Sequence, residues 1–255
     1  MDLGLTDHRV LVCGASRGLG AATARVLAGE GARVAIAARA SESLQASAAE
    51  IGATAIVADL STADGGAGAV SDAVAALGGL DALLMNSGGP PPTTFDGTSD
   101  EAWQNAVDGT LLSTIRVIRE ALPHLNDGRD PSIAIILSSS VREPIPGLIT
   151  SNVIRPGLAG LIKTLVTEIA PIRINGLAPG RFGTERIKRL DEKRAADAGT
   201  TPDEIARQTI SRIPLGRYGD PEELGRVAAF LLSPMASYLT GVILPVDGGM
   251  IKSLP

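Results

Sequence analysis

Short apolar runs alternate with helix-type segments along almost the whole chain. The runs show no regular polar alternation, which is typical of strands that are buried on both faces of a sheet. Strands and helices in alternation indicate right-handed βαβ units, in which helices cover both sides of a parallel sheet. We therefore predict an α/β fold of the Rossmann type, a doubly wound parallel sheet of about seven strands with helices on both faces, in three layers. The expected strands are residues 9–12, 33–37, 54–57, 81–85, 132–137, 173–178 and 242–245, and the expected helices are residues 19–29, 41–51, 62–77, 99–122 and 150–169.

Neither a linker nor a change in composition divides the chain, so we interpret residues 1–255 as a single domain. Two segments interrupt the alternation. Residues 88–98 follow the fourth strand and contain three consecutive prolines, and residues 181–212 form a long charged stretch before the last strand. Loops at the carboxyl ends of the strands form the ligand crevice of such sheets. Both segments are therefore candidate walls of a substrate site, and the second can equally be a solvated pair of helices.

The composition excludes several classes of function. A formal net charge of -5 argues against a general binder of nucleic acid or of anionic membranes, and an aromatic content of 2% argues against base stacking. The single cysteine, Cys13, and two distant histidines predict neither a disulfide nor a metal site. The N-terminal residues lack the features of a signal peptide, and no apolar stretch is long enough to span a membrane. We expect a soluble cytoplasmic protein.

A glycine-rich loop follows the first expected strand and leads into a helix. Glycines at positions 14, 18 and 20 give the pattern G-x-x-x-G-x-G. Such a loop lets the backbone approach a pyrophosphate without obstruction by Cβ atoms, and the helix N-terminus offers free N–H groups. The position of the loop in a βαβ chain makes it a strong signal for a dinucleotide site. The residues expected to bind the cofactor here are Gly14, Ser16, Arg17, Gly18, Leu19 and Gly20.

The end of the second strand predicts which nicotinamide cofactor is bound. An NAD site usually has an acidic residue there, on the ribose 2′-hydroxyl. This chain instead has Ala38 followed by Arg39. Arg39 and Arg17 could together hold a 2′-phosphate, because guanidinium groups bind phosphate in a bidentate manner. We therefore expect NADP(H) to be preferred over NAD(H).

Several motifs in order resemble the short-chain dehydrogenase/reductase family, and the resemblance covers nearly the whole chain. The glycine loop CGASRGLG, the segment MNSG, the stretch IRINGLAPGRFGT and the closing segment that ends in VDGGM are all similar to family motifs. The branch that the chain most resembles is that of the β-ketoacyl reductases. The resemblance implies an oxidoreductase with a nicotinamide cofactor. It also implies further cofactor contacts, at Asp59, Leu60, Asn86, Gly88, Pro179, Gly180 and Thr184.

The resemblance fails at the catalytic positions. The family has a Tyr-x-x-x-Lys motif, in which Tyr is the acid/base and Lys lowers its pKa and binds the ribose. Here the same helix reads SNVIR, so Ser151 replaces the tyrosine and Arg155 the lysine. The family's asparagine, which positions a water, corresponds to Thr110. Its serine, which polarises the carbonyl, corresponds to Ser138, with Ser139 and Ser140 as alternatives.

These replacements weaken acid catalysis. A serine hydroxyl is a far weaker acid than tyrosine, and an arginine does not release a proton near neutral pH. Loss of a general acid typically costs about 10²–10⁴-fold in rate. The remaining candidates for the proton donor are a water held by the serine cluster and Glu143 in the following loop.

Two functions are consistent with these observations. The first is an NADP(H)-dependent oxidoreductase that acts on a small carbonyl or alcohol, including a 3-oxoacyl compound, through an atypical active site. The second is a cofactor-binding protein without ordinary turnover, such as a sensor or an assembly subunit. The family's halohydrin dehalogenases also use arginine, but they keep the tyrosine and lose the glycines, so dehalogenation is the weaker interpretation. The apolar helix 158–169, which pairs with a second subunit in the family, implies a homodimer or homotetramer.

Overall fold

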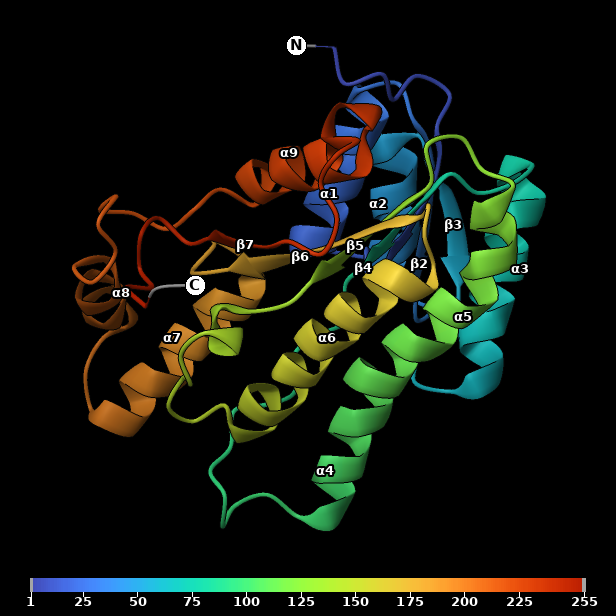
Figure 1. Cartoon of the computed structure of the whole chain (residues 1–255). Coiled ribbons are helices and arrows are strands. Elements are labelled where there is room, and N and C mark those ends of the chain that lie inside the picture. The colour runs from blue at the N-terminus through green and yellow to red at the C-terminus, as the bar shows by residue number, and fades with distance from the viewer. Residues whose placement is uncertain (1, 254–255) are drawn as a thin grey trace.

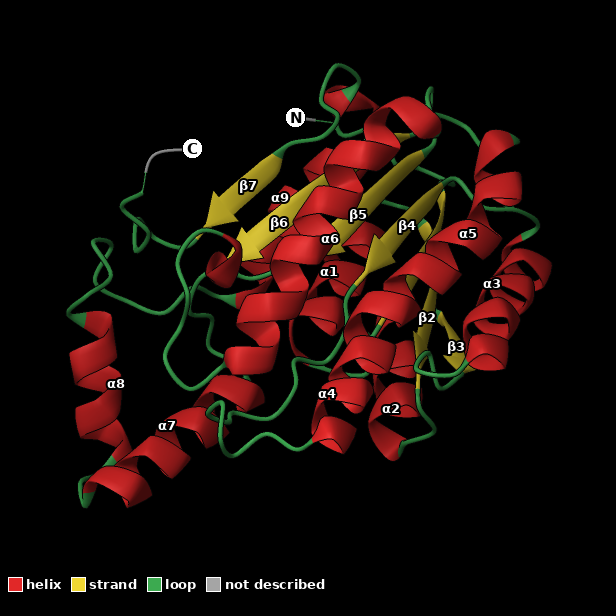
Figure 2. Cartoon of the chain, turned by 60° about the horizontal axis from the view of Figure 1, so that its bottom comes forward, coloured by secondary structure: helices red, strands yellow, loops and turns green. Residues whose placement is uncertain are grey.

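The computed structural model describes residues 2–253 of the chain. Its strands form one parallel sheet in the order β3-β2-β1-β4-β5-β6-β7 (Figures 1 and 2). This order confirms the predicted doubly wound α/β fold, and every strand begins and ends within one residue of the expected bounds. The strands are β1 (Arg9–Cys13), β2 (Arg33–Ala38), β3 (Thr54–Val57), β4 (Ala82–Met85), β5 (Ser132–Ile136), β6 (Arg173–Pro179) and β7 (Ile243–Val246).

Within the described residues, helices pack on both faces of the sheet, together with three short helical turns. The bounds are α1 (Gly18–Gly29), α2 (Glu42–Ile51), α3 (Ala63–Leu77), α4 (Asp100–Ala106), the π-helical turn η1 (Val107–Leu112), α5 (Ser113–Asn126), the 3₁₀ turn η2 (Ser139–Val141), α6 (Ile149–Glu168), α7 (Glu185–Ala198), α8 (Pro202–Ile210), α9 (Pro221–Leu232) and the 3₁₀ turn η3 (Pro234–Ala236). One layer consists of α1, α2 and α9, and the opposite layer of α3, α5 and α6.

Successive residues of each central strand point into opposite halves of the core. In β1, Leu11 and Cys13 pack in the layer of α3, α5 and α6, whereas Val10 and Val12 pack in the layer of α1, α2 and α9. Because both faces are covered, strand positions on both faces must be apolar, which explains the unbroken apolar runs. The edge strands β3 and β7 are only partly buried, because each has a neighbouring strand on one side only.

The helix expected at residues 99–122 is divided and longer than the sequence indicated. It consists of α4, the π-helical turn η1 and α5, and it continues through Pro123 to Asn126. The turn inserts one extra residue into the helical ladder, and such insertions are frequent at functional sites. Thr110, which the sequence aligned with the family's asparagine, lies within this turn.

The charged segment 181–212 contains the pair of helices that one of the two interpretations predicted. Helix α7 runs beside the carboxyl end of the sheet, and α8 turns away from it (Figure 2). Residues of α7 line the cleft described below and residues of α8 do not. The segment is therefore both a helical pair and, over its first half, a wall of that cleft.

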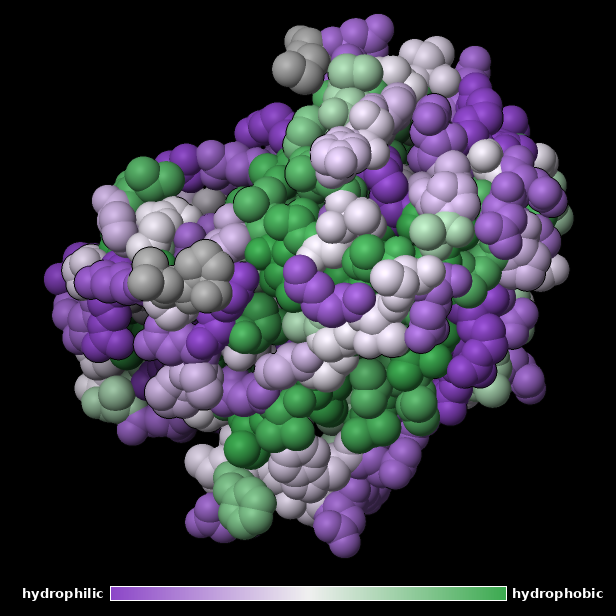
Figure 3. All heavy atoms as spheres, viewed as in Figure 1, coloured by the Kyte–Doolittle hydropathy of each residue, from purple (hydrophilic) through white to green (hydrophobic). Residues whose placement is uncertain are grey.

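The face formed by α4, α5 and α6 carries a group of apolar side chains at its surface (Figure 3). On α6, Val153 is 57% exposed, and Leu161, Leu165 and Val166 are only partly covered. The same helix buries Leu158 and Ile162 against the sheet, so α6 is apolar on two sides. In the described part of the chain, no helix combines the length and the apolar character that crossing a membrane requires.

Candidate active site

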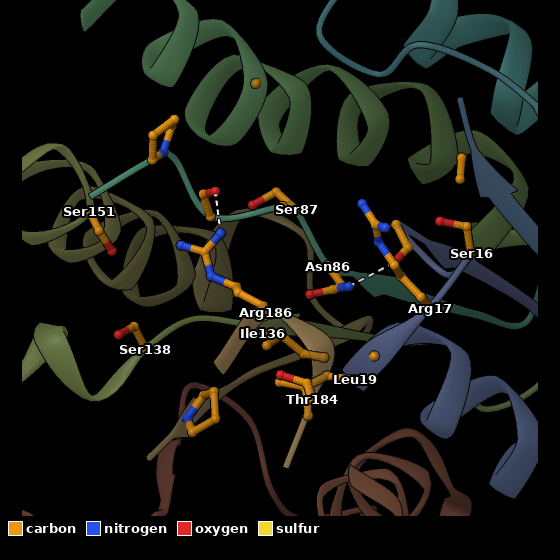
Figure 4. Close-up of a pocket in the computed structure, with 18 of the residues that line it drawn as sticks. Ser16, Arg17, Leu19, Asn86, Ser87, Ile136, Ser138, Ser151, Thr184 and Arg186 are labelled. Carbon is orange, nitrogen blue, oxygen red and sulfur yellow. Dashed lines mark hydrogen bonds between the residues drawn. The ribbon is translucent and has the colours of Figure 1, made fainter. Parts of the chain in front are cut away.

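A cleft of about 1420 Å³ opens at the carboxyl ends of the strands (Figure 4). It lies where the strand order reverses, since β1 connects to β2 on one side and lies beside β4 on the other. Ligands bind at this point in open α/β sheets because the loops that leave neighbouring strands diverge there. The loop after β1, the loop after β4, the start of α6 and the start of α7 form its walls.

Two of the three loop glycines are required by packing within the protein. A Cβ atom on Gly14, where φ is +63°, would stand 2.0 Å from the carbonyl oxygen of Asn86. One on Gly20 would stand 2.5 Å from the carbonyl oxygen of Gly14. Asn86 completes this contact by donating a hydrogen bond of 2.8 Å from Nδ2 to the Gly14 oxygen. These glycines therefore join the loop to the end of β4.

The third glycine, Gly18, faces the open cleft. Its φ is +61°, and the nearest atom to an added Cβ would be Cγ2 of Thr184 at 3.8 Å. Gly18 also begins helix α1, whose N-terminus has no side-chain cap and no acidic residue in its first turn. Helices α2 and α3, in contrast, are capped by Ser41 and Thr62. The free N–H groups and the positive end of the α1 dipole thus lie at the cleft beside the unobstructed backbone of Gly18. This arrangement fits a phosphate group.

Arg17 and Arg39 are exposed and line one end of this cleft, as do Asp59 and Leu60. The Asp59 carboxylate accepts hydrogen bonds from the hydroxyl and the backbone N–H of Ser61, at 2.7 and 3.0 Å. These bonds lower the pKa of Asp59, and the charge of Arg39 adds to the effect. Asp59 therefore stays ionised, but within residues 2–253 neither Arg17 nor Arg39 has a carboxylate oxygen within 4.0 Å, so both guanidinium groups are available to a ligand.

The other residues that the sequence linked to a cofactor also line the cleft, and Figure 4 shows Asn86 and Thr184 between Arg17 and the two serines. Asn86 and Gly88 follow β4, and Pro179, Gly180 and Thr184 follow β6. The Thr184 hydroxyl accepts the backbone N–H of Ile187 at 3.4 Å and so caps α7. All the expected cofactor residues line the cleft except Gly20, which packs against the carbonyl oxygen of Gly14.

Ser138, Ser151 and Arg155 all line the cleft, and Figure 4 shows the two serines at the side away from Arg17. Arg155 is 6% exposed, and its Nη1 donates to the carbonyl oxygens of Ile136 and Leu137 at 2.9 and 2.8 Å. Burial, reinforced by the charge of Arg186, lowers the pKa of Arg155 to about 10. Arg155 is therefore still positively charged at neutral pH.

The three neighbouring serines differ in their access to the cleft. Ser138 and Ser139 line it, whereas Ser140 does not, and the Ser140 hydroxyl is buried without a hydrogen-bond partner among residues 2–253. Ser138 Oγ accepts the backbone N–H of Ser140 at 3.1 Å, which leaves its own proton free to donate. Figure 4 shows Ser138 and Ser151 on the same side of the cleft. Of the three alternatives, this arrangement favours Ser138.

Two of the sequence candidates do not reach the cleft. Thr110 lies in the π-helical turn, is 2% exposed, and accepts the Thr114 hydroxyl at 2.8 Å on its carbonyl oxygen. The cleft is lined there by Asp108 and Gly109 instead. Glu143 is exposed on the loop after η2, outside the lining. Thr110 is buried within the π-helical turn, and Glu143 is exposed to solvent.

The sequence did not single out Arg186, which extends across the cleft. Its Nη1 and Nη2 donate to the carbonyl oxygens of Gly89 and Pro90 at 2.6 and 3.0 Å. Arg186 thus joins the start of α7 to the proline-rich loop after β4. The only signal in the sequence was the run of charged residues after Thr184, which is equally typical of a solvated helix.

Comparison with known proteins places this site in a family. A family model described as enoyl-(acyl carrier protein) reductase matches residues 14–251. The chain is 36% identical to 3beta-hydroxysteroid dehydrogenase 1 of Eggerthella lenta over 256 residues, with 96% of this chain and 94% of that protein covered. The chain belongs to the short-chain dehydrogenase/reductase family. It is also 32% identical to a 3-oxoacyl-[acyl-carrier-protein] reductase of Staphylococcus aureus, over 94% of this chain and 96% of that protein.

Solved structures of short-chain dehydrogenase/reductase proteins share the fold over the full length. An L-sorbose reductase of Gluconobacter frateurii, in complex with NADPH and L-sorbose, has a TM-score of 0.94 at 28% identity and covers 100% of both chains. A short chain oxidoreductase of Pseudomonas aeruginosa PAO1, bound to NADPH and containing an atypical catalytic center, has a TM-score of 0.87 at 31% identity, with 98% of this chain and 100% of that chain covered. The family makes this chain an oxidoreductase of the dehydrogenase/reductase type that uses a nicotinamide cofactor.

Proposed function

We propose that this short-chain dehydrogenase/reductase is NADP(H)-dependent, with an atypical active site that acts on a small carbonyl or alcohol, 3-oxoacyl compounds included. The observation that carries the proposal is that one continuous cleft joins the uncapped N-terminus of α1 and the two arginines Arg17 and Arg39 to the Ser138–Ser151 pair. A dinucleotide laid along this cleft would have its phosphates at one end and its reactive ring at the serines.

The preference for NADP(H) rests on charge. Arg17 and Arg39 line the same end of the cleft, and residue 38, at the end of β2, is an alanine. An acid there would bind a ribose 2′-hydroxyl, while two guanidinium groups favour a 2′-phosphate. Asp59 stays ionised and offsets part of this charge, but two guanidinium groups and one carboxylate line this end of the cleft.

The three central residues would take distinct roles. When bound, the nicotinamide supplies the hydride for the carbonyl carbon. Ser138 has a free hydroxyl proton and would donate it in a hydrogen bond to the substrate oxygen. Ser151 would offer a second hydroxyl from α6. Arg155 would stabilise the negative charge that develops on that oxygen and would hold the ribose through nitrogens other than Nη1.

The proton would have to come from solvent. Within the part of the chain that the structure describes, the cleft lining contains no histidine, cysteine or tyrosine. Ser151 could pass its hydroxyl proton to the alkoxide, but a serine does not remain deprotonated near neutral pH. Its hydroxyl would regain the proton from solvent through a hydrogen-bonded water. This route predicts slow turnover compared with a site that has a tuned tyrosine.

A second candidate is binding without ordinary turnover. The observation in its favour is that Arg155 directs Nη1 at the end of β5, where two carbonyl oxygens accept from it. In this alternative Arg155 mainly fixes α6 to the sheet, and the protein reports on the NADP(H) pool or serves in an assembly.

A fluorescence titration with NADPH and NADH, beside a panel of carbonyl substrates, separates these functions. The proposal predicts tight binding of NADPH, weaker binding of NADH and slow but saturable NADPH oxidation. Binding without turnover on any substrate supports the second candidate. If neither cofactor binds, both functions are wrong.

A further inference from the structure

The half of the cleft beside α7 is strongly cationic, although the whole chain has a formal net charge of -5. Within the described residues, Glu185 is the only acidic residue of α7 that lines the cleft; the other two acids of the lining, Asp59 and Asp108, come from other elements. A cleft with one sign of charge raises the local concentration of ligands of the opposite charge. The cationic residues that line it are Arg155, Arg181, Arg186, Arg189 and Lys193.

These cations lack carboxylate partners within the protein. Across residues 2–253, no carboxylate oxygen lies within 4.0 Å of the guanidinium groups of Arg155, Arg181 or Arg186. Arg155 and Arg186 donate only to backbone carbonyl oxygens. The nearby acid Asp191 is a buried residue of α7, and its carboxylate accepts a hydrogen bond of 2.7 Å from the Tyr218 hydroxyl.

The close approach of like charges is unfavourable without an anion. Arg155 is almost fully buried, and its pKa is lowered first by burial and then by the charge of Arg186. The pKa of Arg181 is lowered by burial and by Arg194 and Arg186, and Asp191 only partly offsets this. An anion placed between the guanidinium groups would relieve both the repulsion and the desolvation.

The phosphates of a dinucleotide would not account for this cluster. They are expected at the glycine loop, where Arg17 and the N-terminus of α1 already provide a site. Figure 4 places Arg186 between the Ser138–Ser151 pair and Asn86, away from Ser16 and Arg17. Arg186 is therefore beside the reacting end of the cleft.

We propose that the substrate carries an anionic group, a carboxylate or a phosphate, and that Arg186 binds it. This inference rests on the proposed function and names the substrate class of the same site. The two hydrogen bonds that Arg186 now gives to the carbonyl oxygens of Gly89 and Pro90 come from separate nitrogens, Nη1 and Nη2. A bidentate anion would take over these donors at charge-assisted strength, while Arg155 and Arg181 would add favourable charge.

Matched substrates of different charge test the inference. NADPH oxidation is measured with acetoacetate beside ethyl acetoacetate, and with dihydroxyacetone phosphate beside dihydroxyacetone. We expect a KM at least tenfold lower for the anionic member of one pair, and the pair that shows it tells whether the anion is a carboxylate or a phosphate. Binding of both anions to the free and NADPH-bound protein is also measured by calorimetry.

The variant Arg186→Gln keeps hydrogen-bond donors and removes the charge. It should raise the KM of the anionic substrate at least tenfold, while the KM of the neutral partner and the Kd of NADPH change less than twofold. Arg226→Gln, an exposed arginine of α9 outside the cleft, is the matched control and should change neither.

Two results would overturn the inference. One is equal KM values, or equal affinities in calorimetry, for the charged and neutral compounds. The other is an Arg186→Gln variant that loses affinity for NADPH in place of the anionic substrate, which would assign Arg186 to the cofactor phosphates. If native protein does not bind NADPH, the proposed function fails, and calorimetry of the two anions on the free protein still decides this inference.

Discussion

Ser151 and Arg155 lie one turn apart on α6, and both face the cleft although each is only 6% exposed. A spacing of four places two side chains on the same side of a helix. The short-chain dehydrogenase/reductase family uses this spacing for a tyrosine and a lysine. The geometry for a paired acid and cation is thus retained, while the chemistry of both groups has changed.

Replacement of Arg39 should alter the choice of cofactor. Arg39→Asp removes one phosphate contact and adds a carboxylate that can accept a ribose 2′-hydroxyl. A charge-assisted hydrogen bond contributes about 1.5–3 kcal/mol, so the affinity for NADPH should fall by about 10–100-fold while the affinity for NADH is unchanged or rises. Fluorescence titration measures both. Arg33→Asp, at the opposite end of β2, is the control. Native protein that binds both cofactors equally would contradict the assignment.

Substitution of Gly20 should chiefly reduce stability, whereas substitution of Gly18 should chiefly reduce NADPH affinity. Gly20→Ala forces a Cβ to within 2.5 Å of the Gly14 oxygen and should lower the free energy of unfolding by about 1–3 kcal/mol or more. Gly18→Ala has room but keeps a positive φ, at a cost of about 1–2 kcal/mol, and should chiefly reduce NADPH affinity. Urea denaturation and NADPH titration of each variant distinguish the two effects.

The control for the Gly18→Ala and Gly20→Ala variants is an alanine at an exposed glycine inside a helix. Gly68→Ala in α3 meets no atom within 4 Å and should raise the free energy of unfolding by about 0.5–1 kcal/mol. A Gly18→Ala variant that binds NADPH as the native protein does would remove the argument that the Gly18 backbone faces the phosphates.

Asp81 should control stability in acid. Burial alone would raise its pKa, but hydrogen bonds from the Arg9 side chain and from the backbone N–H groups of Arg9 and Arg129 hold the pKa well below its ordinary value. A carboxyl group with a depressed pKa stabilises the fold above the unfolded-state pKa of about 4 and loses this contribution as pH falls below that value.

Asp81→Asn should therefore lower the free energy of unfolding by about 3 kcal/mol near neutral pH, because the Arg9 side chain loses its carboxylate. Its denaturation midpoint in urea should depend less on pH than that of the native protein between about pH 5 and 3. A variant with the native pH dependence would show that other carboxylates govern acid unfolding.

The second apolar side of α6 should be covered by another copy of the chain. Leu161, Leu165 and Val166 are only partly buried by the chain itself, and apolar surface of this kind usually marks an interface. Light scattering at micromolar concentration should give two or four times the chain mass of 26.0 kDa. A mass of one chain would contradict the prediction of a homodimer or homotetramer.

The strands and the glycine loop could be predicted because their signals are local. A strand buried on both faces needs an unbroken apolar run, and Gly14, Gly18 and Gly20 follow one such run directly. Asn86 is expected at the cofactor site only from the resemblance of the segment MNSG to a family motif. Sequence alone therefore anticipated most of the cofactor half of the cleft.

The rest depends on contacts between distant residues or on the geometry of single turns. Arg186 meets Gly89 across 97 positions of sequence, and nothing near either residue indicates the contact. No residue pattern announces the π-helical turn that keeps Thr110 out of the cleft. Ser140 could not be separated from Ser138 and Ser139 until the structure placed it outside the cleft lining, and the choice of Ser138 over Ser139 remains a proposal.

The account depends on the replacement of the acid/base pair at Ser151 and Arg155. Ser151→Tyr together with Arg155→Lys would supply a tyrosine and the cation that lowers its pKa at the retained spacing. Ser151 lines the cleft but is only 6% exposed, and Arg155→Lys loses at least part of the contact with Ile136 and Leu137, so thermal unfolding must first confirm that the variants are folded.

Steady-state NADPH oxidation with ethyl acetoacetate, measured from about pH 6 to 9 on native protein, both single variants and the double variant, is the most direct test. The account predicts slow native turnover and a gain of the order of 100-fold in the double variant. Each single variant should gain less, because the two groups act as a unit. A native enzyme that is already fast, and that the double change slows, would show that it has an effective proton donor of its own and would contradict the account.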